Sequence, residues 1–323
     1  MSKLPAYRAP AWLPGGHAQT LWPILRKGAP PAYRRERWDT PDGDFIDVDW
    51  LDAAQETDTP LVVLFHGLEG SSASHYAGAL MSALAQRGWD GAVPHFRGCS
   101  GEPNRLPRAY HSGDADEIDW VLRRMRAQFP QRQIVAAGVS LGGNALLKWA
   151  GEREDMARGV VQAIAAACAP LDLAAAGQAL QQGVSLAYAK HFLVSLKARS
   201  ELKLKQFPDV FDGVRMRAAK TLYDFDDAVT APLHGFHDAG DYWRRASSKP
   251  WLGGVRLPAL VLNALNDPFM PRRALPTQRE VAASVTLEFP AAGGHVGFVS
   301  GAFPGHLDWL PQRLLGFFEQ AVR

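Results

Sequence analysis

A serine between glycines carries the clearest chemical signal in this sequence. Ser140 lies in GVSLG (138–142), after a predicted strand over 133–139 and before a predicted helix over 144–150. The pattern G-x-S-x-G between a strand and a helix is typical of a strained turn that exposes the serine Oγ as a nucleophile. Bulkier flanking residues would clash with neighbouring backbone, which explains the glycines. An inert serine in a glycine-rich turn is the alternative, but the strand–turn–helix context favours the nucleophile.

A serine hydroxyl needs a partner base, and the sequence offers one histidine in a suitable place. Enzymes with this type of turn carry the acid and then the histidine after the serine along the chain. Among ten histidines, only His295 and His306 follow the last candidate acid. His295 stands among glycines in GGHVG (293–297), directly after a predicted strand over 284–289. His306, beside a Pro-Gly pair, is typical of a surface or capping residue, so we predict His295 as the base.

The acid that orients this histidine should end an earlier strand. Asp267 follows a predicted strand over 258–265, within an Asn-Asp-Pro sequence. An ordinary Asp-Pro turn is the alternative, because both residues favour turns. The position of Asp267 between Ser140 and His295 favours it as the third member of a Ser-His-Asp triad.

Two backbone N–H groups are expected to stabilise the oxyanion that such a serine creates. The first is predicted at Leu141, directly after the serine and at the start of the following helix. The second is predicted at Leu68, in the loop HGLEG (66–70) after the first core strand. Both leucines contribute only a backbone donor. His66 in the same loop is expected to brace the loop rather than to transfer protons.

Neither a metal ion nor a nucleotide cofactor is predicted. His234 and His237 have no cysteine, histidine or carboxylate partner at metal-ligand spacing. Asp114, Asp116 and Glu117 fit the first turn of a helix, where acidic residues are favoured without any cation. The sequence also has no Walker pattern and no G-x-G-x-x-G after a strand.

Short apolar runs alternate with helical patterns over most of the chain. This alternation predicts an α/β protein with a mostly parallel, doubly wound sheet. It stops over 171–256, where helices and loops are predicted, so we expect one domain over 1–323 with a helical lid inserted at 171–256. The predicted core strands are 61–65, 91–96, 133–139, 159–168, 258–265 and 284–289, and helices are expected over 74–87, from 114, over 144–150 and over 311–322.

Both ends of the chain carry weaker signals. The first 33 residues are rich in Pro, Gly and Trp and are expected to form an irregular arm. Residues 34–40 and 44–51 flank a Pro-Asp-Gly turn and predict a hairpin. Aspartates alternate with apolar residues in its second half, so one face is expected to be solvated. Pro311 is expected to occupy the first position of the final helix.

Composition and charge exclude several classes of protein. The 35 basic and 33 acidic residues nearly balance and form no long block of one sign, so nucleic acid is not an expected partner. Two cysteines, Cys99 in a loop and Cys168 in the core, cannot form a disulfide framework. The first residues lack a secretory apolar region, and no apolar stretch reaches the length of a bilayer. A cytoplasmic location is therefore expected.

Residues 188–205, inside the insertion, mix leucines with four lysines and one arginine at helical spacing. The simpler interpretation is an amphipathic helix with a solvated basic face. The alternative is a segment that lies on a membrane surface and draws in acyl lipid, which would give the protein a weak membrane contact.

Several longer motifs resemble the YheT-like family of α/β-hydrolases, which includes vertebrate abhydrolase-domain lipases. The resemblance covers nearly the whole chain and departs from the family at Trp243, where a second tyrosine is expected. It implies the α/β-hydrolase fold and hydrolysis of carboxylic esters or acylglycerols, with Ser140, Asp267 and His295 in matching positions. The motifs are WLPGGHAQTLWP (12–23), HGLEGSSASHY (66–76), FRGCSGEPN (96–104), YHSGDADEID (110–119), GVSLGGN (138–144), DFDDAVTAPLHGF (224–236), DYWRRASS (241–248), LPALVLNALNDP (257–268) and GGHVGF (293–298).

The residues and the resemblance together predict a serine hydrolase. Its expected substrates are small-molecule or lipid-like esters with short- to medium-chain acyl groups, cleaved through an acyl-enzyme intermediate. An acyltransferase or a thioesterase would use the same triad. A non-catalytic binding protein of the same fold is a further alternative. Epoxide and haloalkane hydrolases are disfavoured, because they use a carboxylate where Ser140 stands.

Overall fold

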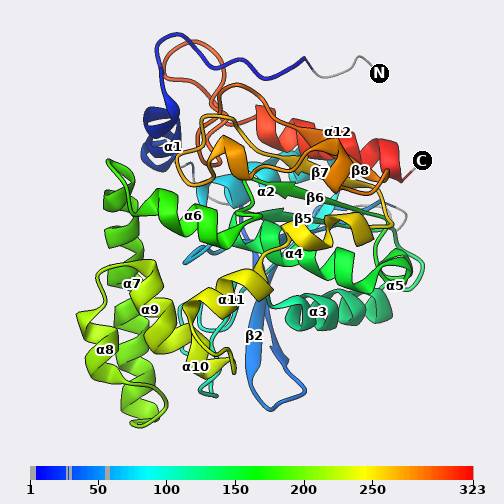
Figure 1. The fold of residues 1–323 in the computed structure, drawn as a ribbon. Coiled ribbons are helices and arrows are strands. Elements are labelled where there is room, and N and C mark those ends of the chain that lie inside the picture. The colour runs from blue at the N-terminus through cyan, green and yellow to red at the C-terminus, as the bar shows by residue number, and fades with distance from the viewer. Residues whose placement is uncertain (1–4, 27, 29–30, 55–58, 323) are drawn as a thin grey trace.

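An eight-stranded sheet forms the centre of the protein in a computed structural model (Figure 1). The structure describes residues 5–26, 28, 31–54 and 59–322. The strand order is β1-β2-β4-β3-β5-β6-β7-β8. The strands are β1 (Arg34–Asp39), β2 (Phe45–Leu51), β3 (Leu61–Phe65), β4 (Asp90–Pro94), β5 (Ile134–Val139), β6 (Ala163–Ala167), β7 (Ala259–Leu262) and β8 (Val285–Glu288).

The six strands from β3 to β8 run parallel, which confirms the predicted doubly wound sheet. The predicted hairpin is also confirmed, since β1 and β2 pair antiparallel and β2 joins the sheet beside β4. β3 lies between β4 and β5, so the chain changes its direction of growth across the sheet at β3. Ligands of open α/β sheets bind beyond the carboxyl ends of the strands at such a point.

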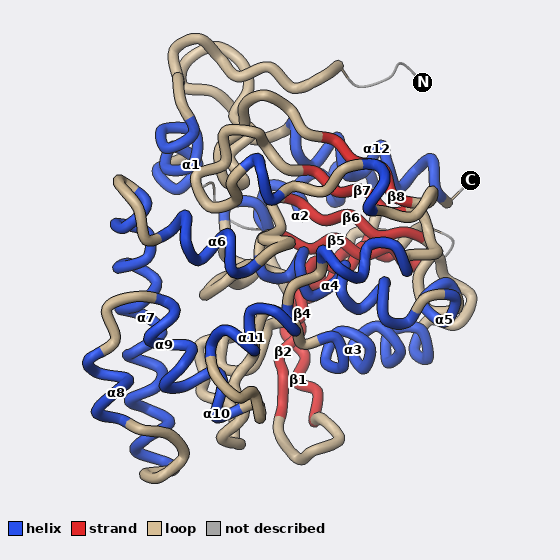
Figure 2. The backbone as a smooth tube through the Cα atoms, in the orientation of Figure 1, coloured by secondary structure: helices blue, strands red, loops and turns tan. Residues whose placement is uncertain are grey.

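Helices cover both faces of the sheet (Figure 2). α2 (His75–Arg87) and α12 (Trp309–Ala321) cover one face, while α3 (Ala115–Gln128) and α4 (Leu141–Arg153) cover the other, with the short α5 (Asp155–Arg158) after α4. Successive strand residues point to opposite faces. In β3, Leu61, Val63 and Phe65 therefore pack with α3 and α4, and the two residues between them pack with α2 and α12. Burial on both faces explains the continuous apolar runs.

The stretch between β6 and β7 is helical and lies mostly to one side of the sheet in Figure 1. It contains α6 (Leu173–Leu180), α7 (Ser185–Gln206), α8 (Gly213–Ala218), α9 (Leu222–Phe225), η1 (Asp226–Thr230), α10 (Ala231–Leu233), α11 (Ala239–Ala246) and η2 (Lys249–Gly254). Two further single turns, η3 (Arg272–Ala274) and η4 (Gln278–Glu280), lie between β7 and β8. No helix in the described part of the chain is long and apolar enough to cross a bilayer.

The prediction of a solvated face is wrong for the second strand of the hairpin, where the alternating aspartates lie. All seven residues of β2 are buried, because β2 lies inside the sheet between β1 and β4. Its carboxylates are paired: Asp47 accepts two hydrogen bonds from Arg37, and Asp49 accepts two from Arg35. A buried charge is tolerated when a partner of opposite charge satisfies it, so the alternation marked ion pairs rather than solvent.

The prediction of an irregular N-terminal arm is wrong for residues 16–25. They form α1 (Gly16–Leu25), which includes Pro23. A helix of ten residues with an internal proline is not stable alone in water, so contacts with the rest of the protein must hold it.

The predicted position of Pro311 in the last helix is also wrong, because α12 begins at Trp309 and the proline occupies its third position. That position is still in the first turn, where an N–H has no acceptor within the helix.

The predicted basic face of residues 188–205 is only partly solvated. They lie within α7, where Lys197, Arg199 and Lys203 donate hydrogen bonds to backbone carbonyls of other segments. Lys190 and Lys205 remain exposed. Most of the positive charge on this helix is therefore engaged inside the protein, which weakens the charge argument for a membrane-surface segment.

Candidate active site

Ser140 lies at a tight turn between β5 and α4. Its backbone has φ 52° and ψ −121°, a conformation that is costly for a residue with a Cβ atom. A Cβ at Gly142 would lie 2.4 Å from the Phe65 carbonyl oxygen, so only glycine fits there. The Ser140 N–H donates to the carbonyl of Ala167 at the end of β6 (2.9 Å). The turn therefore holds the serine at the carboxyl edge of the sheet, in the strained geometry that the motif predicted.

The structure brings Ser140, His295 and Asp267 together. His295 Nε2 lies 3.0 Å from Ser140 Oγ, and His295 Nδ1 lies 2.9 Å from Asp267 Oδ2. The Asp267 side chain is fully buried, and that of His295 is 11% exposed. A carboxylate can only accept a hydrogen bond, so the proton sits on Nδ1 and the Nε2 lone pair faces the serine hydroxyl. This is the arrangement in which an imidazole can take the serine proton.

The aromatic ring of Phe269 lies against the imidazole of His295. The two ring centroids are 4.1 Å apart and the planes differ by 24°. The Phe269 N–H donates to Asp267 Oδ1 (2.8 Å), so both carboxylate oxygens of Asp267 are bound. Tyr188 of α7 also contacts Phe269, with the two ring centroids 4.9 Å apart. Sequence reasoning missed Phe269, although it stands two residues after the predicted acid.

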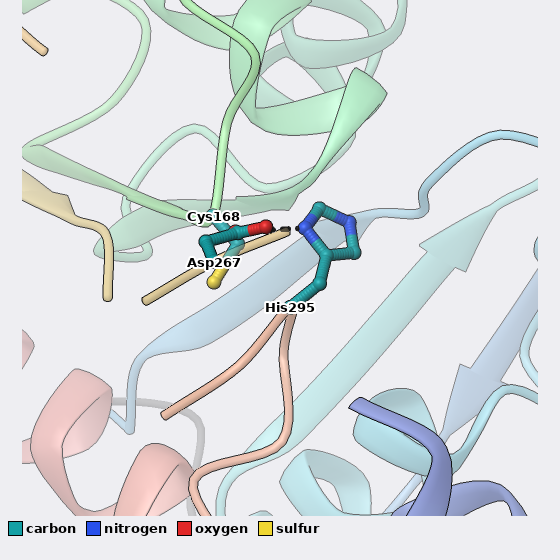
Figure 3. A group of neighbouring side chains, drawn as sticks. All are labelled: Cys168, Asp267 and His295. Atoms are coloured by element: carbon teal, nitrogen blue, oxygen red, sulfur yellow. Dashed lines mark hydrogen bonds and ion pairs between the residues drawn. The ribbon is translucent and has the colours of Figure 1, made fainter. Parts of the chain in front are cut away.

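Cys168 lies beside the Asp267–His295 pair (Figure 3). The potential ligand atoms of these three residues lie within 4.8 Å of one another, and they form the only such cluster found among the described residues. Burial, and then the Asp267 charge, raises the pKa of the Cys168 thiol well above its ordinary value. A protonated thiol is a poor metal ligand, and the other two groups are already joined by a hydrogen bond. The chemistry of this cluster therefore gives no reason to place a metal ion between these three residues. The other cysteine of the sequence, Cys99, is also buried and has a free thiol.

The loop after β3 approaches the serine closely. A Cβ at Gly67 would lie 3.2 Å from the Ser140 Cβ. The Gly67 N–H donates to the Tyr76 hydroxyl (2.8 Å), and the Glu69 N–H donates to the Tyr110 hydroxyl (2.9 Å). These two bonds fix the backbone on either side of residue 68. The tyrosines were missed as functional residues, although both end or begin motifs of the family resemblance.

His66 braces this loop from behind. The Phe96 N–H donates to His66 Nε2 (3.1 Å), so the ring proton must be on Nδ1, which donates to the Gly67 carbonyl (2.8 Å). Burial lowers the pKa of His66 to about 3, so the ring is neutral at physiological pH. This confirms the structural role expected for His66.

A cavity of about 400 Å³ lies beside Ser140 and His295. This is within the size range of small-molecule sites. Most of its apolar wall comes from the helical stretch between β6 and β7. Asp226, in the same wall, binds the Trp243 indole N–H (2.7 Å), and burial raises the pKa of this carboxyl to about 6. Apolar lining residues include Leu173, Leu180, Phe192, Leu196, Phe225, Val229 and Trp243.

The other histidines considered above have different partners. His306 has a side chain that is 53% exposed, which fits the predicted surface position. His234 is packed against His111, with ring centroids 4.4 Å apart. His237 is exposed and pairs with Asp238 (2.9 Å). His234 and His237 therefore lie in different surroundings.

The acidic side chains at the start of α3 are paired with arginines. Asp114 caps α3 by accepting the Glu117 N–H, and it also accepts two hydrogen bonds from Arg108. Glu117 accepts one from Arg97 (2.6 Å). Burial, and then the Asp114 charge, raises the pKa of Glu117 to about 7. Asp114 and Glu117 are therefore engaged by arginines within the protein.

The fold and this geometry define a class of protein. The family described as alpha/beta hydrolase fold matches residues 60–302, and the chain belongs to this family. More particularly, the chain is 38% identical over 303 residues to the Escherichia coli (strain K12) protein named "Putative esterase YheT", covering 92% of this chain and 88% of that one. It is 28% identical over 325 residues to human "Phospholipase ABHD3", covering 98% and 79%.

A solved structure, the esterase Pf2001 of Pyrococcus furiosus, has a TM-score of 0.55 to this chain at 14% identity. The match covers 90% of this chain and 92% of the esterase chain. This likeness shows a shared fold. The predicted α/β-hydrolase fold and the resemblance to the YheT-like family are therefore both confirmed.

Proposed function

We propose that this protein is a serine hydrolase that cleaves carboxylic esters through an acyl-enzyme intermediate. The proposal rests above all on the unbroken chain of hydrogen bonds from Ser140 Oγ through His295 to Asp267. The adjoining apolar cavity and the similarity to proteins named esterase and phospholipase support an ester with an apolar acyl group.

The triad geometry supports a reaction in two halves. Ser140 Oγ attacks the ester carbonyl while His295 Nε2 takes the hydroxyl proton, and the tetrahedral intermediate then expels the alcohol, which takes that proton from His295. A water molecule next gives a proton to His295 and attacks the acyl group. The acid leaves, and the proton returns to Ser140. Asp267 stays ionised throughout, holding the imidazole tautomer and stabilising the imidazolium.

We further propose that the N–H groups of Leu68 and Leu141 bind the oxyanion. Leu141 is the first residue of α4, where the helix N-terminus favours negative charge. Leu68 lies between two residues whose own N–H groups are bound to Tyr76 and Tyr110. Donors fixed before the reaction stabilise a transition state without any cost of reorganisation.

The double variant Y76F/Y110F is expected to lower kcat. It keeps both rings but removes the hydroxyls that hold the backbone around Leu68. The expected loss is about 10- to 100-fold, because an oxyanion donor displaced by a fraction of an ångström stabilises the transition state poorly. Kinetics should show KM nearly unchanged, and a trifluoromethyl ketone inhibitor should lose affinity in parallel with kcat. Y7F, which removes the Tyr7 hydroxyl bond to the Val299 carbonyl, is the matched control. Equal effects in the two variants would count against the assigned oxyanion loop.

We propose that residues 171–256 act as a lid that sets substrate choice. The segment leaves the sheet after β6 and returns at β7, and it supplies most of the apolar cavity wall. Each CH₂ group buried in such a cavity contributes about 0.8 kcal/mol. The lid therefore favours acyl chains over acetate.

We expect kcat/KM for p-nitrophenyl esters to rise from acetyl to medium-chain esters and then to level off as the cavity fills. The expected rise is roughly 4-fold for each added CH₂, from about 0.8 kcal/mol. Initial rates on a graded series of esters measure it. Activity that is highest on acetate and falls steadily with chain length would refute the acyl cavity but leave the triad untouched.

Reaction with a fluorophosphonate probe tests the proposed function directly. We expect one equivalent of probe to label Ser140, as located by peptide mass spectrometry. A protein that labels at no serine and hydrolyses no ester of the series would instead be a non-catalytic member of the fold. Product analysis separates the remaining alternatives: transfer of the acyl group to added alcohol in preference to water would indicate an acyltransferase, and a preference for thioesters a thioesterase.

A further inference from the structure

Helix α1 packs directly against the two loops that carry the acid and the base. A Cβ at Gly16 would lie 2.0 Å from the carbonyl oxygen of Asn266, the residue before Asp267. On the other loop, a Cβ at Gly297 would lie 2.0 Å from the Gln19 carbonyl oxygen. The backbone of α1 therefore lies in close contact with the backbone of both loops.

Thr20 of α1 forms a hydrogen bond to the backbone of His295 and so holds the loop that carries this histidine. Its Oγ1 accepts the His295 N–H at 2.9 Å and donates to the Gly16 carbonyl at 2.7 Å. The second bond fixes the hydroxyl proton, so that the oxygen lone pair is directed at His295. Thr20 is only 5% exposed, so water does not readily replace either bond.

The Gln19 side chain connects the loop that carries Asp267 to the loop that carries His295. Its Oε1 accepts from the Asn266 side-chain amide (3.0 Å) and from the Gly293 N–H (2.9 Å). Its Nε2 donates to the Leu13 carbonyl (2.9 Å), which fixes the orientation of the amide. The Asn266 Oδ1 accepts the Gly294 N–H (3.0 Å), so three consecutive N–H groups, 293–295, bind α1 or its partner Asn266.

We propose that α1 is a positioning element for the acid–base pair, with Gln19 and Thr20 as its positioning residues. The inference rests on the proposed function of the triad. α1 lies outside the matched hydrolase family region, residues 60–302. The loop it holds contains three glycines between 293 and 297 and needs outside support to aim an imidazole.

The variant T20V tests the inference, because valine keeps the shape of threonine but cannot accept the His295 N–H. We expect the second-order rate constant of fluorophosphonate labelling, and kcat, to fall by about 10- to 100-fold with KM nearly unchanged. The labelling end point should remain one equivalent. T20S, which restores the hydroxyl, should recover most of the rate. T40V is the matched control, since Thr40 is equally buried (5%) and its hydroxyl binds Asp42 in the hairpin turn.

The final amount of label bound per protein distinguishes a positioning role of Thr20 from a role in folding. A merely structural role for Thr20 would lower the stoichiometry or the melting temperature in T20V and T40V alike, while the folded fraction reacted at the wild-type rate. That result would overturn the proposal. Gln19→Met provides a second variant with the same expectation. A wild-type protein that never labels would refute the proposed function instead.

A measurement on the unmodified protein decides the matter if neither variant folds. Amide hydrogen exchange of residues 293–295 should be slow, because each N–H is bound to α1 or to Asn266. If T20V does fold, the deshielded proton resonance of its His295 Nδ1–H should broaden or shift as the Asp267 bond loosens. Fast exchange of all three amides in the wild type would overturn the inference whether or not the protein hydrolyses esters.

Discussion

Replacing Ser140 by alanine is expected to lower ester turnover by about 10⁶-fold, the loss that follows removal of a triad nucleophile. Alanine has no Oγ, so no acyl-enzyme can form, and only cavity binding and the oxyanion donors remain. Steady-state rates on the best ester of the series measure the effect. Fluorophosphonate labelling should disappear with the activity.

The control for this variant is Ser284→Ala. Ser284 also loses a hydroxyl bond, from Oγ to the Val255 carbonyl (2.7 Å), but lies next to β8 and outside the triad. Turnover should be unchanged in the control, and both variants should melt near the wild-type temperature. If S140A kept most of its activity, the nucleophile would have to be another residue.

Replacing Asp267 by asparagine is expected to lower kcat by roughly 10⁴-fold with the fold intact. The asparagine amide can donate to His295 Nδ1, which would move the ring proton to Nε2 and leave no lone pair to accept the Ser140 proton. The asparagine Oδ1 can still accept the Phe269 N–H, so the loop should keep its shape. Circular dichroism and the melting temperature check the fold, and kcat checks the chemistry.

His306→Gln serves as the counterpart of this experiment. His306 is the other histidine in a suitable place along the chain, yet its side chain is 53% exposed and bound to Asp308. Its replacement should leave turnover within about twofold, as is usual for surface positions. Retained turnover in D267N would point to another acid, and a collapse in H306Q would count against His295 as the base.

The sequence by itself determined the sheet and the three residues that meet at its edge. Strands buried on both faces must be continuously apolar, so β3, β5 and β7 were visible as short runs. The carboxyl ends of parallel strands lie along one edge, so residues directly after them come together. Ser140 after β5 and Asp267 after β7 follow this rule. The apolar runs and the residues that follow them are local features of the sequence, but they place residues that are far apart in the chain at one edge of the sheet.

Only the tertiary structure decided what holds these residues in place. Thr20 and His295 are 275 positions apart, and no local pattern records a bond between them. α1 itself could not be predicted, because a short helix with an internal proline forms only against the loops that it supports. The aspartates of β2 were misjudged for the same reason: a charge opposite an arginine of β1 is buried, and alternation alone cannot distinguish that partner from water.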